Sequence, residues 1–285
     1  MQSITLRSPA KLNLFLDVVN KRPDGYHNIE IVFEKIDLCD IITIKKRKSG
    51  IKITCTDPKV PLNKNNLCYK AISLLKDKFQ KIKGAQIIIE KNIPVAAGLG
   101  GGSSNAASVI LGAKKLWGLD LTQKETLELA VKLGADVAFF TKNWSFAKGE
   151  GIGEKLTQIK SKKKFWHILV NPGFGISTKM VYSLVKSSLT KKNTGIKIVI
   201  CAVKKGDTES LKSSFYNRLQ GIVLSNNKAV GRRLRQIKDA GEKTVCLSGS
   251  GPTLFTIHPD KASAARLYTK LTKHNIGYVA MARTR

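Results

Sequence analysis

A run of glycines followed by two serines is the feature of this sequence best suited to chemistry. It reads Pro94-Val-Ala-Ala-Gly-Leu-Gly-Gly-Gly-Ser-Ser-Asn-Ala-Ala107. A glycine loop that enters a helix exposes backbone N–H groups and the positive end of the helix dipole, and both suit phosphate. The chain has no Gly-Lys dipeptide, so it lacks a Walker A lysine, and the loop ends in Ser103 where GxGxxG needs glycine. The pattern predicts another kind of phosphate loop, with a tight strand–helix turn as the alternative.

Three further positions and a second glycine loop are candidates for chemistry. Asp136 is an acid within the apolar stretch Leu133–Phe140. A buried acid needs a partner or a catalytic task, although a helix-capping or loop aspartate is the alternative. Lys11 adjoins a hydrophobic strand, and its side chain could point into a site. The backbone of a second glycine loop, Leu247–Thr253, could contact a ligand. His27 has no second histidine or carboxylate at metal-binding spacing, so zinc is not indicated and we assign no metal ligand.

Strand and helix patterns alternate irregularly along the chain and predict an α+β fold. Period-two hydrophobicity predicts a strand over 10–19, and Ile41–Lys45 with Ile51–Thr54 predicts a hairpin around Ser49-Gly50. Thr122 and Glu125 form a capping-box sequence that opens a helix. Other strands are expected at 85–90, 165–170, 244–248, 253–258 and the C-terminal end, and helices at 66–81, 103–115, 177–188, 207–224, 226–239 and 260–274.

Charge is the unusual part of the composition. The 285 residues include 50 Lys and Arg against 20 Asp and Glu, a formal net charge of +30. Lysine dominates this excess, and specific nucleic-acid recognition usually relies on arginine. The five scattered cysteines contain no CxxC pair, which argues against a disulfide scaffold and a zinc ribbon. No stretch is long and apolar enough to span a bilayer, and the start lacks a signal-peptide core.

Three segments resemble the signature regions of the GHMP small-molecule kinases. They are Ser8-Pro-Ala-Lys-Leu-Asn-Leu14, Pro94–Ala107 and Leu247–Thr253. Together with Arg22-Pro-Asp-Gly-Tyr-His27 and Gly134-Ala-Asp-Val137, they resemble the branch of the superfamily that phosphorylates a cytidine-diphosphate ester of methylerythritol. The resemblance implies a two-domain fold: a ribosomal-protein-like ATP-binding domain over 1–160 and a ferredoxin-like substrate domain over 161–285, with the site between them.

The resemblance also implies the reaction and its residues. ATP, with Mg²⁺, would phosphorylate the 2-hydroxyl of the methylerythritol unit, a step of the non-mevalonate route to isoprenoid precursors. Asp136 matches the family's catalytic aspartate and Lys11 its companion lysine. The residues that match ATP-binding positions are Pro94, Gly98, Leu99, Gly100, Gly101, Gly102, Ser103, Ser104, Asn66 and Lys91. Those that match substrate-binding positions are Asn13, Tyr26, His27, Thr178, Tyr182, Gly249, Ser250 and Gly251.

Two other functions remain open from the sequence. One is a mevalonate- or homoserine-type GHMP kinase, although the Tyr26-His27 pair suits a substrate that contains cytosine. The other is a basic nucleic-acid-binding protein, which the net charge alone would favour. We expect small-molecule partners, no specific nucleic acid, no membrane, and a monomer or homodimer. The expected location is the bacterial cytoplasm, or a plastid if a transit peptide has been removed.

Overall fold

The chain divides into two compact units that each combine separate stretches of sequence. The computed structural model describes residues 2–185, 195–274 and 276–285. The first unit comprises Met1–Ala10, Leu38–Val95 and Gly100–Asn143, and the second comprises Lys11–Asp37, Ala96–Leu99 and Trp144–Arg285. The domain boundary that we predicted near residue 160 falls inside the second unit, between two strands. The boundary between the two family domains therefore stays a prediction.

Two long strands, β1 (Ser3–Lys21) and β2 (His27–Arg47), contribute residues to both units. In the first unit, β4 (Gly84–Glu90) pairs antiparallel with Ile41–Arg47 of β2, and β3 (Gly50–Cys55) pairs parallel with β4. The predicted hairpin is therefore wrong, because β4 lies between the two strands that would form it. Gly84 makes this possible: a Cβ there would lie 2.5 Å from the Ser49 carbonyl carbon, so only glycine lets the short β2–β3 connection pass so closely.

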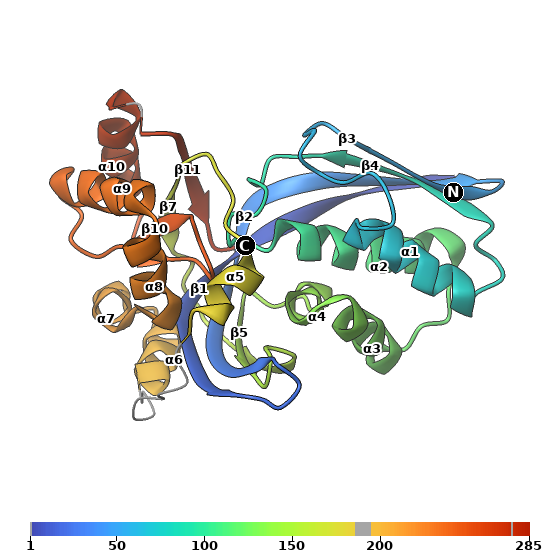
Figure 1. The fold of residues 1–285 in the computed structure, drawn as a ribbon, viewed down its shortest axis with the longest axis horizontal. Helices are drawn as coiled ribbons and strands as arrows, with labels where there is room; N and C mark the ends of the chain where they lie inside the picture. The colour runs from blue at the N-terminus through green and yellow to red at the C-terminus, as the bar shows by residue number, and fades with distance from the viewer. Residues whose placement is uncertain (1, 186–194, 275) are drawn as a thin grey trace. The chain divides into compact units, whose positions relative to one another are not determined.

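The helices of the first unit lie on one face of its strands (Figure 1). They are α1 (Leu67–Lys78), α2 (Gly101–Trp117), α3 (Gln123–Leu133) and α4 (Ala135–Thr141). The capping box at the start of α3 is confirmed, with Thr122 and Glu125 each bonding the other's backbone N–H. Small residues let α2 pack closely on the strands: a Cβ on Gly112 would lie 2.7 Å from side-chain atoms of Leu6 and Ile44. This packing holds the second half of α2 close to β1 and β2.

Strands of the second unit belong to two sheets. In one, β8 (Tyr216–Asn217) pairs parallel with Phe15–Leu16 of β1, while β5 (Phe146–Glu150) pairs antiparallel with Ile31–Glu34 of β2 and with β6 (Lys155–Ile159). The other sheet is antiparallel, in the order β11 (Tyr278–Arg283), β7 (Trp166–Asn171), β10 (Leu254–His258), β9 (Cys246–Leu247). The sequence patterns did not reveal β5 or β6.

The described helices of the second unit include one, Gly195–Lys205, that the sequence patterns did not predict, and one predicted helix is divided in two. The described helices are α5 (Thr178–Ser183), α6 (Gly195–Lys205), α7 (Thr208–Ser214), α8 (Arg218–Asn226), α9 (Lys228–Asp239) and α10 (Lys261–Lys273). The helix predicted over 207–224 is two helices, because Tyr216 and Asn217 are extended and pair with β1, and Asn217 caps α8. The part of the helix predicted over 177–188 that follows residue 185 lies outside the described residues.

Candidate active site

The first glycine loop has the backbone geometry of a strained turn that opens into α2. Ala96, Gly98 and Gly100 all have positive φ, at 52°, 75° and 68°. Gly100 is the N-cap of α2, and in the described structure no side chain caps this helix. The first-turn N–H groups of a helix have no partner within it, so those of Gly101, Gly102 and Ser103 are available to an anion. The loop therefore has the local structure that phosphate binding requires.

Ser104 is held in place by a residue that sequence reasoning missed. Ser8 donates from Oγ to Ser104 Oγ at 2.9 Å, and both side chains are buried. Ser8 lies in the first signature segment, three residues before Lys11, and this position was the only sequence evidence for a role of Ser8 in the site. Its contact with the glycine loop spans 96 positions and could not be predicted from spacing.

Within the second unit, the two glycine loops lie against each other. Ser248 Oγ donates to the Gly98 carbonyl oxygen at 3.0 Å. A Cβ on Gly98 would lie only 2.1 Å from the Ser248 carbonyl oxygen and 2.9 Å from the Gly251 nitrogen. The structure thus brings Gly98 together with the Leu247–Thr253 loop, and glycine is required at position 98 for both its φ and this close approach.

Lys11 and Asn13 lie under the second glycine loop. Lys11 donates from its backbone N–H to the Leu99 carbonyl at 3.0 Å and from Nζ to Asn13 Oδ1 at 2.5 Å. Both side chains are buried. A Cβ on Gly249 would lie 3.0 Å from Asn13 Oδ1 and 3.1 Å from Lys11 Nζ. Among the described residues, Asn13 Nδ2 is buried without a hydrogen-bond partner, so it is a donor that a ligand could satisfy.

Asn217 anchors the second glycine loop, and sequence reasoning also missed it. Its Nδ2 donates to the carbonyls of Leu247 at 2.7 Å and Gly249 at 2.8 Å. At the far side of the loop, Ser250 Oγ lies 2.9 Å from Thr178 Oγ1. Three of the predicted substrate residues, Thr178, Ser250 and Gly249, are therefore held in one hydrogen-bonded cluster.

His27 and Tyr182 form an aromatic pair. Their ring centroids lie 5.6 Å apart with the planes tilted by 37°. Partial burial, and next the charge of Lys21, lower the pKa of His27, which favours the neutral ring with one donor and one acceptor nitrogen. Tyr26 is 61 % exposed and offers its ring to a ligand rather than to the core. Flat rings with polar edges suit recognition of a nucleobase.

Asp136 lies in the first turn of α4, directly after Gly134. It is half-buried, and the apolar residues that follow it, Val137 to Phe140, are buried. Asp136 is therefore less buried than the apolar residues that follow it in the sequence. A negatively charged side chain in the first turn of a helix interacts favourably with the helix dipole.

Lys91 and Asn66 have structural partners. Lys91 Nζ donates to Asp40 Oδ2 at 2.6 Å and to the Ile93 carbonyl at 2.7 Å, and Asp40 Oδ1 accepts from the backbone N–H groups of Asn92 and Ile93. Lys91 Nζ would lie 3.1 Å from a Cβ on Gly101, which places it beside the first turn of α2. Asn66 caps α1, accepting from Cys68 N at 2.8 Å. Sequence reasoning missed Asp40, an acid with no exposed side-chain surface that ends up facing Lys91.

The described residues contain no group of three or more His, Cys, Asp or Glu arranged to hold a metal ion. In that same part of the chain, every helix is too short or too polar to traverse a lipid bilayer.

Family profiles cover both halves of the chain. Residues 66–143 match the GHMP kinases N terminal domain, and residues 200–277 match the GHMP kinases C terminal domain. The chain is 38% identical to a 4-diphosphocytidyl-2-C-methyl-D-erythritol kinase of Alkaliphilus metalliredigens, over 95% of this chain and 94% of the relative. It is 41% identical to a protein of the same name from Clostridioides difficile, over 93% of this chain and 90% of the relative.

The fold of the chain is also similar to solved structures of kinases. The fold is similar to a crystal structure of 4-(cytidine 5'-diphospho)-2C-methyl-D-erythritol kinase, with a TM-score of 0.83, 28% identity and 98% of each chain covered. A homoserine kinase from Cytophaga hutchinsonii has a TM-score of 0.80 at 15% identity, covering 100% of this chain and 95% of its own, and shows the shared fold alone.

Proposed function

The chain belongs to the 4-diphosphocytidyl-2-C-methyl-D-erythritol kinase family of GHMP kinases, and we propose that it phosphorylates the 2-hydroxyl of 4-(cytidine 5'-diphospho)-2-C-methyl-D-erythritol with ATP. The single observation that carries the substrate assignment is the identity of 36–41% over nearly the whole chain to relatives of this name. The aromatic pair His27–Tyr182 supports it, since a base with polar edges is what such a pair recognises. The products are the 2-phosphate and ADP.

ATP phosphates are assigned to the first glycine loop. The uncapped N–H groups at the start of α2 support this, with Gly98 to Ser104 surrounding the phosphates and Pro94 leading into the loop. Lys91 and Asn66 are assigned to ATP binding as well, and the hydrogen bonds that hold Lys91 at the Ile93 carbonyl and Asn66 at the start of α1 support a fixed position for each. Mg²⁺ bound with ATP would neutralise part of its phosphate charge.

Proton transfer is assigned to Asp136 and charge neutralisation to Lys11. In the proposed step, the Asp136 carboxylate accepts the proton of the acceptor hydroxyl, whose oxygen forms a bond to the γ-phosphorus as the bond to ADP breaks. Lys11 stabilises the negative charge on the transferring group. Phosphoryl transfer needs mainly positioning and charge neutralisation, so one base, one lysine and a phosphate loop are sufficient protein groups.

The rest of the substrate is assigned to the second unit. Tyr26, His27 and Tyr182 would hold the cytosine, and Thr178 the sugar and diphosphate. The donor Asn13 Nδ2, buried and without a partner among the described residues, supports its role as a ligand contact. Gly249, Ser250 and Gly251 would close over the methylerythritol end, and the close approach of Gly249 to Lys11 and Asn13 supports this.

A coupled assay tests this function. Purified protein with ATP, Mg²⁺ and the cytidyl substrate should release ADP, while mevalonate and homoserine should give no turnover. Turnover on mevalonate or homoserine alone would place the protein in another branch of the family. We further propose a bacterial cytoplasmic location, because Alkaliphilus metalliredigens and Clostridioides difficile are bacteria, and a monomer or homodimer, which light scattering would decide.

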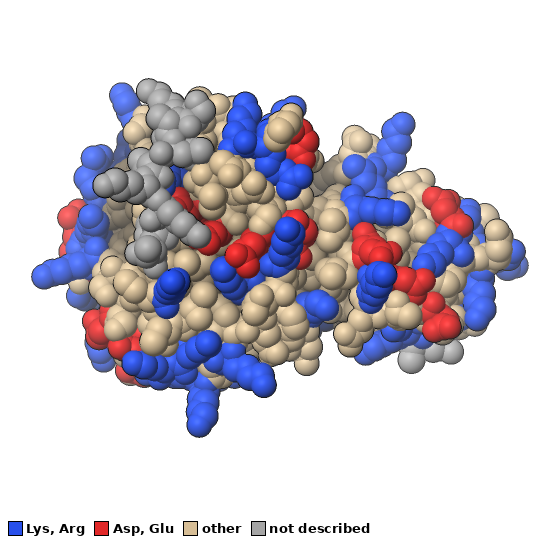
Figure 2. Space-filling view, turned by 90° about the horizontal axis from the view of Figure 1, so that it is seen from below, with Lys and Arg blue, Asp and Glu red and all other residues tan. Residues whose placement is uncertain are grey.

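The face of the molecule shown in Figure 2 gives no support to nucleic-acid binding as a second function. In Figure 2, Lys and Arg side chains are scattered over many parts of the visible face with acidic groups among them, and they do not gather into one continuous patch. Specific nucleic-acid binding generally requires such a patch or stripe.

A further inference from the structure

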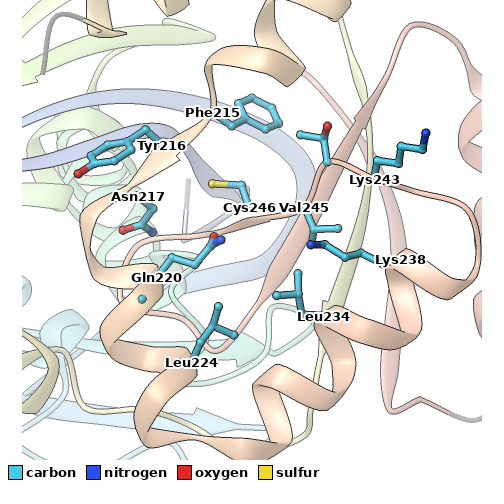
Figure 3. Close-up of a pocket in the computed structure, with 12 residues that line it drawn as sticks. Phe215, Tyr216, Asn217, Gln220, Leu224, Leu234, Lys238, Lys243, Val245 and Cys246 are labelled. Carbon is cyan, nitrogen blue, oxygen red and sulfur yellow. The ribbon is translucent and has the colours of Figure 1, made fainter.

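A pocket outside the proposed active site opens between α8, α9 and the segment that leads into β9 (Figure 3). Its volume is about 420 Å³, which lies within the range of small-molecule sites. Its lining includes Gln220 and Leu224 from α8, Leu234 and Lys238 from α9, and Val245 before β9. None of the residues assigned above to ATP, the substrate or catalysis lines it.

The lining of this pocket combines an apolar base with positive charge. Gln220, Leu224 and Leu234 point into the space between the helices, and Lys238 extends toward it from α9 (Figure 3). The lining holds two lysines, Lys238 and Lys243, and no carboxylate. Within the part of the chain that the structure describes, Lys238 Nζ has no hydrogen-bond or ion-pair partner. A ligand that fits this surface carries an anionic group and an apolar body.

The pocket shares two residues with the support of the second glycine loop. Gln220 lines the pocket and accepts from Leu247 N through Oε1 at 2.7 Å. Asn217 also lines it and donates to the carbonyls of Leu247 and Gly249. A ligand in the pocket that displaces either side chain would change the hydrogen bonds that fix the loop.

We propose that this pocket binds a small phosphate monoester with an apolar chain, and that its occupancy changes turnover through Gln220 and Asn217. The phosphate lies at Lys238 and the chain lies over Leu224 and Leu234. Lysine binds phosphate well as a point charge, and Lys238 extends its charge toward the pocket. The effect on turnover rests on the proposed function, whereas binding itself does not.

Calorimetry with n-hexyl phosphate tests the binding, with inorganic phosphate and hexan-1-ol as the head-only and chain-only probes. Hexyl phosphate should bind more tightly than either probe. Lys238→Gln should weaken its binding about fivefold or more, the value of one charge-assisted contact at an open site. Lys228→Gln removes the same charge from an exposed position of α9 that does not line the pocket, and it should bind like the wild type.

Two binding results would overturn the site. One is equal binding of hexyl phosphate and inorganic phosphate, which would indicate surface charge alone. The other is an equal loss of affinity in Lys228→Gln and Lys238→Gln. Because calorimetry needs no turnover, these results are independent of whether the proposed reaction occurs.

Kinase assays test the coupling. Hexyl phosphate should change kcat/KM for the cytidyl substrate in the wild type and Lys228→Gln proteins, and should have little effect in Lys238→Gln. Gln220→Met should still bind hexyl phosphate but lose the response, since methionine cannot accept from Leu247 N in the same way. An unchanged response in Lys238→Gln would show competition at the ATP phosphates and overturn the coupling.

Discussion

At the scale of single residues, Asp136 carries the most direct prediction. Asp136→Asn should lower kcat about 10²- to 10⁴-fold, because the amide cannot accept the hydroxyl proton. The fold should persist, since the residue is only half-buried and asparagine keeps its size. Steady-state kinetics beside a thermal melt measures both effects.

A matched control for Asp136 lies after α2. Asp120→Asn makes the same chemical change at an exposed position and should leave kcat at the wild-type value. Near-normal turnover in Asp136→Asn, or an equal loss in both variants, would remove Asp136 from the role of base.

The buried pair Lys91–Asp40 gives a second prediction. Both side chains are nearly inaccessible, at 5% and 0% exposure. Lys91→Met leaves the Asp40 carboxylate buried without its cation, so the free energy of unfolding should fall by about 3–5 kcal/mol. The KM for ATP should also rise, because Lys91 bonds the Ile93 carbonyl next to the phosphate loop.

Urea denaturation measures this loss against an exposed ion pair. Arg22 and Asp24 are 2.8 Å apart, with much of both side chains in water. Arg22→Met should therefore cost less than about 1 kcal/mol. Similar losses in the two variants would mean that burial does not set the strength of the Lys91–Asp40 pair.

Residue contacts of this kind were the least predictable part of the site. Asp40 and Lys91 lie 51 positions apart, and Ser8 and Ser104 lie 96 apart. No local pattern encodes such a pairing, because it depends on which strands become neighbours. The assigned residue types came instead from the family's signature segments, and their roles stay predictions.

At the scale of elements, the two glycine loops are the feature to test. Gly98→Ala should destabilise the protein and suppress turnover, since its φ of 75° is unfavourable for alanine and its Cβ would meet the Ser248 carbonyl at 2.1 Å. We expect a cost of about 1–3 kcal/mol or more from the backbone strain alone.

Gly102→Ala is the matched control for the stability measurement. A Cβ at Gly102 meets nothing within 4 Å and its φ is not in the left-handed region. Its melting temperature should equal or exceed that of the wild type, because alanine favours the helix. A normal melting temperature for Gly98→Ala would contradict the close contact between the loops.

Local signals predicted elements well and failed where pairing decides the structure. The capping box at Thr122 and the glycine-to-helix transition at Gly100 depend on neighbours within a few residues, and both are present. The parallel pairing of β3 with β4 and the break in the helix at Tyr216 depend on distant strands. Those distant interactions outweigh local preference, which explains why the hairpin and the long helix were wrong.

At the scale of the whole molecule, His258 links stability to pH. Burial, and next the charge of Lys212, lower its pKa to about 4. An unfolded chain takes up this proton near pH 6.5. Between pH 6.5 and 4 the unfolded state therefore binds more protons, and the free energy of unfolding should fall as the pH falls.

His258→Gln should flatten this dependence by up to about 1.4 kcal/mol per pH unit, the value of one differential proton. Glutamine can still bond Thr256 Oγ1, the present partner of His258 Nε2 at 2.8 Å. Urea denaturation from pH 4.5 to 7.5 measures the slope. Parallel slopes for the wild type and the variant would show that His258 does not control it.

The strands β1 and β2, which contribute to both units, also determine the order in which the protein can be completed during synthesis. Every stretch of the first unit has been made once Asn143 is joined, whereas the second unit takes Lys11–Asp37 from the start of the chain. Phe15 and Leu16 must wait for Tyr216 and Asn217, and Glu34 must wait for Thr284, which donates a hydrogen bond to it at 2.5 Å. β1 thus stays without its partner β8 until Asn217 has been made, and β2 stays without Thr284 until translation is nearly finished. Strand edges that are unpaired in this interval are prone to aggregate.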